Sequence, residues 1–269
     1  MNVPAPYGQA TIHVAYATHI GHLPRKQQDA LLVGDRVMQA PAVQPTVEDV
    51  HAEDCLIAVA DGVTLGPAGG IASRTLLEIL AELWRGSRTK GELRPLNSRD
   101  IRSAQFRLCE RLAHARTRGA ATTLVMAHLL DDGAHILHVG DSRAYRITAA
   151  GDLCCLTKDH TAARRLIEEG EIADCDVEQL CSMMRSLDGA IIADYAADDF
   201  PVDASTVRLA AGEGLLLCTD GVIDALPRNV GDWWGEDKVS DHALRLVQQI
   251  MDGVKGEDNA TLVVLLASG

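Results

Sequence analysis

The sequence predicts an α+β fold in which antiparallel sheets carry helices on their outer faces. Short apolar runs that end at Gly- or Asp-containing turns recur along most of the chain, as in antiparallel sheets. Two longer segments, 71–84 and 98–116, instead space their apolar residues for helices. The 269 residues are 47% hydrophobic and show no internal repeat or linker, so we expect a single domain over 1–269.

The first part of the chain alternates between strands and irregular segments. Residues 11–18 alternate moderately and 29–34 hold a short apolar run, so both are expected to be strands. Residues 40–54 are rich in Pro, Val and acids, which predicts a loop or an irregular hairpin tip. Residues 55–60 are fully apolar and end at Asp61-Gly62, which predicts a buried strand followed by a turn.

Two helices are expected next. Leu76, Leu80 and Leu83 follow a helical period within 71–84. After a polar link at 86–97, Ser98 is a good N-terminal cap for a second helix that runs to about Arg116. Packed against sheets, these helices would form an outer layer.

The second half predicts an antiparallel meander and then mixed elements. The meander strands are expected at 121–130, 135–139, 143–148 and 153–156, joined by turn residues at 131–133, 140–141 and 151–152. Further helices are expected at 161–169, 177–184 and 241–251, and further strands at 206–209, 214–219 and 261–267.

Composition excludes some classes of protein. The formal net charge of −13 argues against a general binder of nucleic acid or anionic membrane, since these need an excess of Lys and Arg. Most acidic residues are expected to form a solvated surface, but a few could converge on cations. The first ten residues lack a signal-peptide pattern, and no apolar run approaches the ~18 residues of a membrane span. The seven cysteines show no C-x-x-C spacing and predict reduced thiols in a cytoplasmic protein.

Aspartates follow or precede several of the expected strands. Asp61, Asp141 and Asp220 each come at the end of an apolar run, and Asp258 lies just before the last one. Taken singly, an Asp-Gly pair after a strand is most simply a tight turn. Taken together, carboxylates held at strand ends can be aimed at one point, where cations must offset their repulsion. Carboxylates, carbonyls and water are the ligands of Mg²⁺ and Mn²⁺, and the shortage of nearby histidines argues against zinc there.

Seven motifs in order resemble the metal-dependent protein phosphatases, the PPM or type 2C family that acts on phosphoserine and phosphothreonine. The resemblance covers nearly the whole chain. The motifs are Gln27-Gln28-Asp29, Val59-Ala60-Asp61-Gly62, Gly119-Ala120-Ala121-Thr122-Thr123, Val139-Gly140-Asp141-Ser142-Arg143, Leu156-Thr157-Lys158-Asp159-His160-Thr161, Leu217-Cys218-Thr219-Asp220-Gly221 and Asp258-Asn259-Ala260-Thr261.

The resemblance implies a four-layer α-β-β-α sandwich of two antiparallel sheets flanked by helix pairs, with a flap at about 161–204. It also implies two Mn²⁺ or Mg²⁺ ions and a third, weaker position. By motif, Asp61 would bridge two ions, the Gly62 carbonyl would bind one, and Asp220 and Asp258 would bind the other. Asp29 would act through bound water, and Asp141 would join Asp220 at the third position.

The implied reaction is hydrolysis of a phosphate monoester by a metal-activated water, with Asp61, Asp220 and Asp258 at its centre. Arg25 resembles the phosphate-binding arginine of the family, although its spacing is one residue short, which leaves a solvated surface arginine as the alternative. Arg143 is expected to form a structural ion pair, and His160 to hold its loop rather than to act as an acid.

The chain also departs from the family pattern. Val63 replaces the histidine proposed as general acid in some members, so either water protonates the leaving group or the enzyme is slower. Gln28 stands where many members have Glu, which would weaken one metal position. Because the aspartates remain, we expect activity. The alternatives are a pseudophosphatase that binds phosphoproteins or a kinase, and a phosphoesterase acting on small molecules.

The resemblance to stand-alone bacterial members also implies partners. These members oppose a Ser/Thr kinase, so phosphorylated proteins are the expected substrates of a cytoplasmic monomer. The Asp-Gly-Val-Thr stretch at Asp61 resembles that of members associated with type VI secretion.

Overall fold

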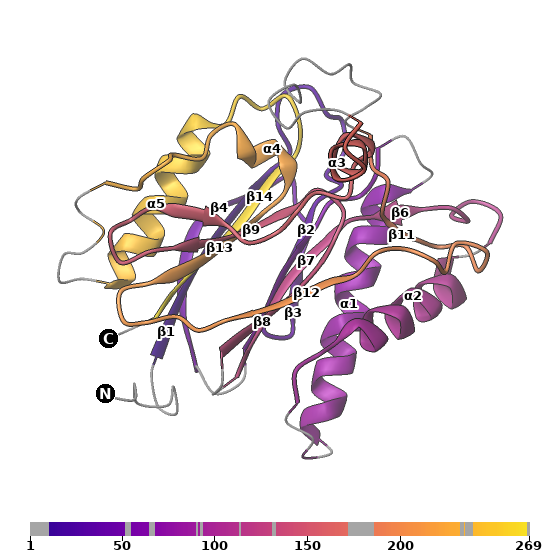
Figure 1. Ribbon diagram of the computed structural model, residues 1–269, viewed down its shortest axis with the longest axis horizontal. Helices are drawn as coiled ribbons and strands as arrows, with labels where there is room; N and C mark the ends of the chain where they lie inside the picture. Colours follow the sequence, from indigo (N-terminus) through magenta and orange to yellow (C-terminus); the bar gives the residue numbers. More distant parts are fainter. Residues whose placement is uncertain are drawn as a thin grey trace.

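Two antiparallel sheets pack face to face, with helices outside them (Figure 1). The computed structural model describes residues 11–51, 55–64, 68–89, 91, 94–112, 114–130, 133–171, 186–231, 234 and 239–267. Among them, α5 (Val239–Gly253) covers one sheet, and α1 (Gly69–Thr89) and α2 (Ser98–Leu112) cover the other. The expected four-layer α-β-β-α order is therefore confirmed, although the partner of α5 in the described residues is only the four-residue α4 (Asp220–Ile223).

Each sheet has six strands. The sheet beside α5 has the order β10 (Leu153–Cys155), β9 (Arg143–Ile147), β13 (Gly214–Cys218), β14 (Ala260–Ala267), β1 (Thr11–His19) and β4 (Ala42–His51). The sheet beside α1 and α2 has the order β12 (Asp203–Val207), β8 (Gly133–Val139), β7 (Leu124–Leu130), β5 (Cys55–Ala60), β2 (Ala30–Val33) and β3 (Arg36–Met38). A small third sheet pairs β6 (Ala121–Thr122) with β11 (Ile191–Ile192).

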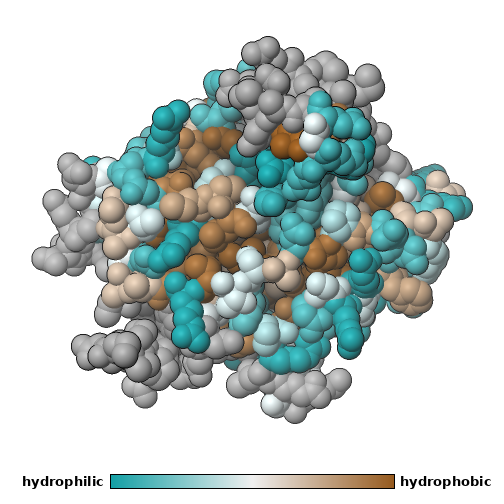
Figure 2. Space-filling view, viewed as in Figure 1, coloured by the Kyte–Doolittle hydropathy of each residue, from teal (hydrophilic) through white to brown (hydrophobic). Residues whose placement is uncertain are grey.

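Three apolar layers hold the sandwich together. One lies between the two sheets, one under α1 and α2, and one under α5. The central strands β5 and β7 are buried on both faces, which explains why they are continuous apolar runs rather than alternating ones. On the face shown in Figure 2, apolar surface gathers toward the middle and hydrophilic side chains border it.

The expected meander from 121 to 156 is wrong in its topology. β7 and β8 pair in one sheet, whereas β9 and β10 pair in the other. The chain changes sheets at Gly140, which has a φ of 108° and where a Cβ atom would lie 2.6 Å from the Thr123 side chain. Only glycine suits both conditions. The crossing places Asp141 at the end of the sandwich rather than in a hairpin turn.

The segment 40–54 contains a strand rather than the expected loop. β4 is an edge strand that pairs with β1, and the register shifts between Tyr16 and Thr18, opposite Gln44 and Pro45. A proline lacks the N–H that a central strand needs, but an edge strand with a bulge tolerates it. Charged residues such as Glu48 and Asp49 also suit an exposed edge.

The helices differ from expectation mainly at their ends. α1 continues five residues beyond Trp84, and α2 ends at Leu112 rather than near Arg116. Of the expected flap, the structure describes α3 (Ala162–Glu168) and the return through β11, while the helix expected at 177–184 lies outside the described residues. Within the described residues, no helix combines the length and apolarity needed to cross a membrane.

Candidate metal centre

Five aspartates from distant parts of the chain meet at one end of the sandwich, the end where α4 begins (Figure 1). The charges of the other four all act on the carboxyl group of Asp61, which follows β5. We call this set the carboxylate cluster; its members are Asp29, Asp61, Asp141, Asp220 and Asp258. The sequence therefore predicted correctly which aspartates converge.

Ionisation is unfavourable for four members of the cluster, Asp29, Asp61, Asp141 and Asp220. Burial, followed by the charges of its neighbours, raises the pKa of Asp61 well above its usual range. Burial raises the pKa of Asp29 to about 7, although hydrogen bonds from Thr261 and Thr219 oppose it. Burial and the charge of Asp220 raise the pKa of Asp141 to about 7, and burial and Asp258 raise the pKa of Asp220. Several carboxylates at one point are unfavourable at neutral pH unless a cation offsets their charge.

Two further observations fit divalent ions at this position. Asp29 is only 1% exposed, and its Oδ1 atom has no hydrogen-bond partner among the described residues. The carboxyl groups of Asp61 and Asp220 are close enough to interact by a hydrogen bond when one of them is protonated, and a bound cation could replace that proton. A donor set of carboxylates without imidazole or thiolate suits Mg²⁺ or Mn²⁺.

The cluster is wide rather than compact. No three of its carboxylates offer oxygen atoms that all lie within 4.8 Å of one another in the described structure.

Thr123 fixes the relative positions of two members of the cluster. The Asp61 N–H donates to Thr123 Oγ1 at 3.0 Å, and the Thr123 N–H donates to the Asp61 carbonyl at 2.8 Å. The same hydroxyl lies 2.7 Å from Ser142 Oγ, beside Asp141. The end of β5 and the crossing after β8 are therefore joined through one buried side chain.

The glycines after Asp61 and Asp220 allow close backbone approach rather than turns. Neither Gly62 nor Gly221 has a positive φ. A Cβ atom on Gly62 would lie 2.2 Å from the backbone of Gly69, and one on Gly221 would lie 2.0 Å from the carbonyl oxygen of Asn259. The simple tight-turn interpretation of these Asp-Gly pairs is therefore wrong.

Asn259 and Thr219 organise the other side of the cluster. The Gln28 N–H donates to Asn259 Oδ1 at 2.6 Å, and Asn259 Nδ2 donates to the Ile20 carbonyl at 2.7 Å. Thr219 Oγ1 donates to Asp29 Oδ2 at 2.8 Å. Thr123, Asn259 and Thr219 were not among the site residues predicted from the sequence. The feature of the sequence that could have identified them is a small polar residue next to an otherwise apolar strand.

A broad cavity of about 1050 Å³ adjoins the cluster at Asp258. Arg25 is exposed and lines this cavity together with Lys26 and Gln28. The structure therefore brings Arg25 to the side of the cluster, while its contact with phosphate stays a prediction.

The structural contacts predicted for Arg143 and His160 are present. Arg143 makes a two-pronged ion pair with Asp159, with N···O distances of 2.8 and 2.6 Å. The backbone N–H of His160 donates to the Gly140 carbonyl at 2.7 Å, and the backbone N–H of Gly140 donates to the ring atom Nδ1 of His160 at 3.1 Å. His160 therefore holds the crossing loop in place.

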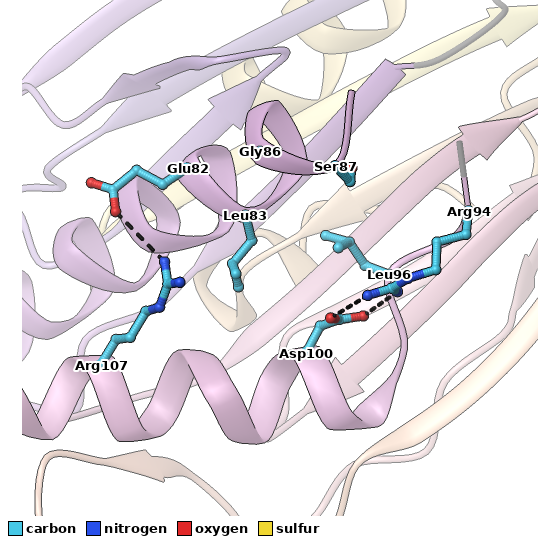
Figure 3. A pocket seen from close by; sticks show the side chains of 8 residues that line it. All are labelled: Glu82, Leu83, Gly86, Ser87, Arg94, Leu96, Asp100 and Arg107. Atoms are coloured by element: carbon cyan, nitrogen blue, oxygen red, sulfur yellow. Dashed lines mark hydrogen bonds and ion pairs between the residues drawn. The ribbon is translucent and has the colours of Figure 1, made fainter. Parts of the chain in front are cut away.

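A separate, smaller pocket of about 170 Å³ lies between α1 and α2 (Figure 3). Its charged side chains pair with one another, Arg94 with Asp100 and Arg107 with Glu82. None of its lining residues belongs to the carboxylate cluster, so it is not part of the metal centre.

Comparison with solved structures gives the same fold. The serine/threonine phosphatase PstP/Ppp of Mycobacterium tuberculosis aligns with a TM-score of 0.68 at 23% identity, covering 96% of this chain and all of that one. The catalytic domain of PstP in complex with two manganese ions aligns with a TM-score of 0.62 at 24% identity, over 96% and 100% of the two chains. PppA, a regulatory component of T6SS in Pseudomonas aeruginosa, aligns with a TM-score of 0.64 at 19% identity, over 96% and 99%.

Sequence comparison gives the family. PstP of M. tuberculosis is 29% identical over 223 residues, which are 81% of this chain, and the chain spans about two fifths of that relative's length (41%). The phosphatase stp of Listeria monocytogenes is 25% identical over 221 residues, or 78% of this chain and 83% of the relative. The profile described as protein phosphatase 2C matches residues 44–250, more than half of the chain. The chain belongs to the protein phosphatase 2C family.

Proposed function

We propose that the protein is a Mn²⁺- or Mg²⁺-dependent serine/threonine protein phosphatase. The observation that carries the proposal is the carboxylate cluster, with the unpaired buried oxygen of Asp29 at its side. The relatives named as serine/threonine phosphatases, one of them solved with two manganese ions, support it.

Each residue of the cluster would have its own role in binding the ions. Asp61, at the centre, would contact both ions, the Gly62 carbonyl would bind one of them, and Asp220 and Asp258 would hold the other. Asp29 would act through a water molecule, and Asp141 with Asp220 would hold a third, weaker ion. Bound divalent ions would supply a water of lowered pKa and offset charge on the phosphoryl group.

The protein itself would position the substrate. Asp61 has its backbone fixed by Thr123 and Asp29 has its carboxylate fixed by Thr219, so neither group needs to reorganise. Arg25, in the cavity beside Asp258, would bind the phosphoryl oxygens.

The shape of the cavity favours a protein substrate over a small phosphate ester. Besides Arg25 and Lys26, the cavity is lined by Leu23 and Ile71, which are 72% and 50% exposed. Exposed apolar residues beside a phosphate-binding group can contact the side chains that flank a phosphorylated residue. Hydrolysis of a phosphothreonine peptide at no higher catalytic efficiency than p-nitrophenyl phosphate would contradict this preference.

Asp220→Asn tests the proposed activity directly. We expect this variant to lose Mn²⁺-dependent hydrolysis of p-nitrophenyl phosphate by at least ~100-fold, since even loss of a residue that only orients a metal ligand costs up to that much. Asp224→Asn is the matched control, because Asp224 lies four residues further on and pairs only at the surface with Lys255. Full activity of Asp220→Asn, or activity of the wild type in EDTA, would rule the proposal out.

The finer assignments remain part of the proposal. A kinase that makes the substrates, a cytoplasmic location and a monomeric state are proposed from the family resemblance. The similarity to PppA, at 19% identity, concerns the fold alone, so a role in type VI secretion is also only proposed. Light scattering of the purified protein would test the monomer.

A further inference from the structure

A second group of ligand-type side chains lies outside the carboxylate cluster. Among the residues that the structure describes, it is the one set of three His, Cys, Asp or Glu side chains whose ligand atoms all lie within 4.8 Å of one another; its members are His138, His160 and Asp203. We call it the His–His–Asp group.

The group combines two neighbouring strands and a loop. His138 of β8 and Asp203 of β12 are direct partners in the antiparallel register, so their side chains lie on the same face. His160 comes from the loop after β10; its ring centroid is 4.7 Å from that of His138, and its Nε2 is 3.2 Å from Asp203 Oδ2. The sheet register therefore assembles the group.

His138 is buried without the partners that an imidazole needs. It is 1% exposed, and neither ring nitrogen has a hydrogen-bond partner among the described residues. Leaving such a group buried and unpaired is unfavourable unless something binds it. Burial, and next the neighbouring His160, lower its pKa to about 4, outweighing the opposite effects of Asp203, Asp159 and the Ser142 backbone. At neutral pH the ring therefore offers a free lone pair.

Small cavities give access to this position. One of about 250 Å³ is lined by His138 and Asp203, and a second of about 370 Å³ is lined by His160 and the same Asp203. Asp203 is exposed between them. An ion could enter from solvent and keep a water molecule as its remaining ligand.

We propose that the His–His–Asp group binds a zinc-type divalent transition metal, at a site separate from the carboxylate cluster. Two imidazoles and one carboxylate with an open position are a ligand set of Zn²⁺, whereas Mg²⁺ and Mn²⁺ favour oxygen ligands alone. In a tetrahedral site with bonds of about 2.0–2.1 Å, neighbouring ligand atoms lie about 3.3 Å apart. The observed 3.2 Å between His160 Nε2 and Asp203 Oδ2 fits this spacing.

Occupation of this site has a consequence for the metal centre. His160 Nδ1 accepts the Gly140 N–H, so the neutral ring carries its proton on Nε2, toward Asp203. A metal bound at Nε2 requires the ring proton to move from Nε2 to Nδ1 through solvent, and the new Nδ1–H then points at the Gly140 N–H. The hydrogen bond from the Gly140 N–H to His160 Nδ1 therefore breaks, and Gly140 is the residue before Asp141. Metal binding at the His–His–Asp group therefore inhibits the proposed phosphatase activity, because it loosens the turn that holds Asp141 in the carboxylate cluster.

Calorimetric titration with Zn²⁺ in excess Mg²⁺ tests the site without relying on phosphatase activity. We expect Asp203→Asn to bind Zn²⁺ at least ~10-fold more weakly than the wild type. Asp188→Asn is the control, because it removes the same charge from the same cavity while Asp188 pairs with Arg165 rather than with the group. Equal Zn²⁺ binding by Asp203→Asn and the wild type overturns the proposal.

Two further measurements locate the ion and its effect. Anomalous diffraction from a Zn²⁺-soaked crystal should show a peak bonded to His138 and His160, and a peak confined to the carboxylate cluster overturns the proposal. The Gly140 amide should exchange faster with solvent when Zn²⁺ is added, and an unchanged rate overturns the coupling to Asp141.

Discussion

At the scale of single residues, short polar side chains rather than the aspartates themselves determine the geometry of the cluster. Thr123 binds both backbone groups of Asp61 and contacts Ser142. Thr123 and Ser142 are buried, so a lost partner leaves an unpaired polar atom rather than one that water can satisfy. The precision of the site therefore depends on hydroxyl groups that hold the aspartates in place.

Thr123→Val keeps the shape of the side chain and removes its hydroxyl. We expect it to lower the free energy of unfolding by ~1–3 kcal/mol, because buried polar groups lose their partner. We also expect kcat to fall by ~10–100-fold, as when other residues that orient metal ligands are replaced. Urea denaturation and steady-state assays at saturating Mn²⁺ measure the two effects. Thr148→Val, which removes a hydroxyl that serves only the Asp152 turn, should leave kcat unchanged. A Thr123→Val enzyme with normal kcat would show that Thr123 does not position Asp61.

At the scale of elements, glycines decide how closely the segments that carry aspartates approach. Gly221 at the start of α4 packs against the carbonyl of Asn259 at the start of β14, and this contact brings Asp220 beside Asp258. Gly62 and Gly69 meet in the same way between β5 and α1. These contacts are made between backbones, so a single methyl group would separate the elements.

Gly221→Ala and Gly253→Ala form a matched pair. A Cβ on Gly221 would lie 2.0 Å from a backbone oxygen, whereas one on Gly253 in α5 would lie 3.5 Å from the side chain of Ala225. We expect Gly221→Ala to destabilise the protein by ~1–3 kcal/mol or more and to weaken Mn²⁺ binding, and Gly253→Ala to be neutral or stabilising by up to ~1 kcal/mol. Thermal unfolding and Mn²⁺ titration check both, and similar behaviour of the two variants would contradict the packing argument.

At the scale of the whole molecule, the cluster connects stability to pH and to metal. The pKa values of Asp29 and Asp141 are raised to about 7 in the folded protein, compared with about 3.9 in an unfolded chain. Between these values the folded state binds more protons than the unfolded state, so the free energy of unfolding falls as the pH rises. Metal binding replaces these protons and removes the repulsion.

We therefore expect the Tm of the metal-free protein to fall between pH 5 and pH 8. Mn²⁺ should raise Tm more at pH 8 than at pH 5, by on the order of 5 °C. Scanning calorimetry with and without EDTA measures this difference. Asp220→Asn should raise the metal-free Tm at pH 8, because it removes one repelling charge from the cluster. This variant therefore distinguishes repulsion within the cluster from the general effect of a net charge of −13. A metal-free Tm that rises from pH 5 to pH 8 would contradict the argument.

The sequence by itself determined the α+β class, most of the strands and the identity of the five aspartates, because periodicity and motifs are local properties of the chain. It did not determine that β8 and β9 belong to different sheets, or that β4 is an edge strand. The choice of sheet depends on a close contact between Gly140 and Thr123, and the tolerance of Pro45 depends on the position of its strand at an edge. The hydroxyl and amide groups that align the cluster, and the pairing of His138 with Asp203, were likewise decided only by the tertiary structure. Such contacts join residues that are far apart in sequence, and neither partner's own surroundings in the sequence indicate which residue will lie opposite.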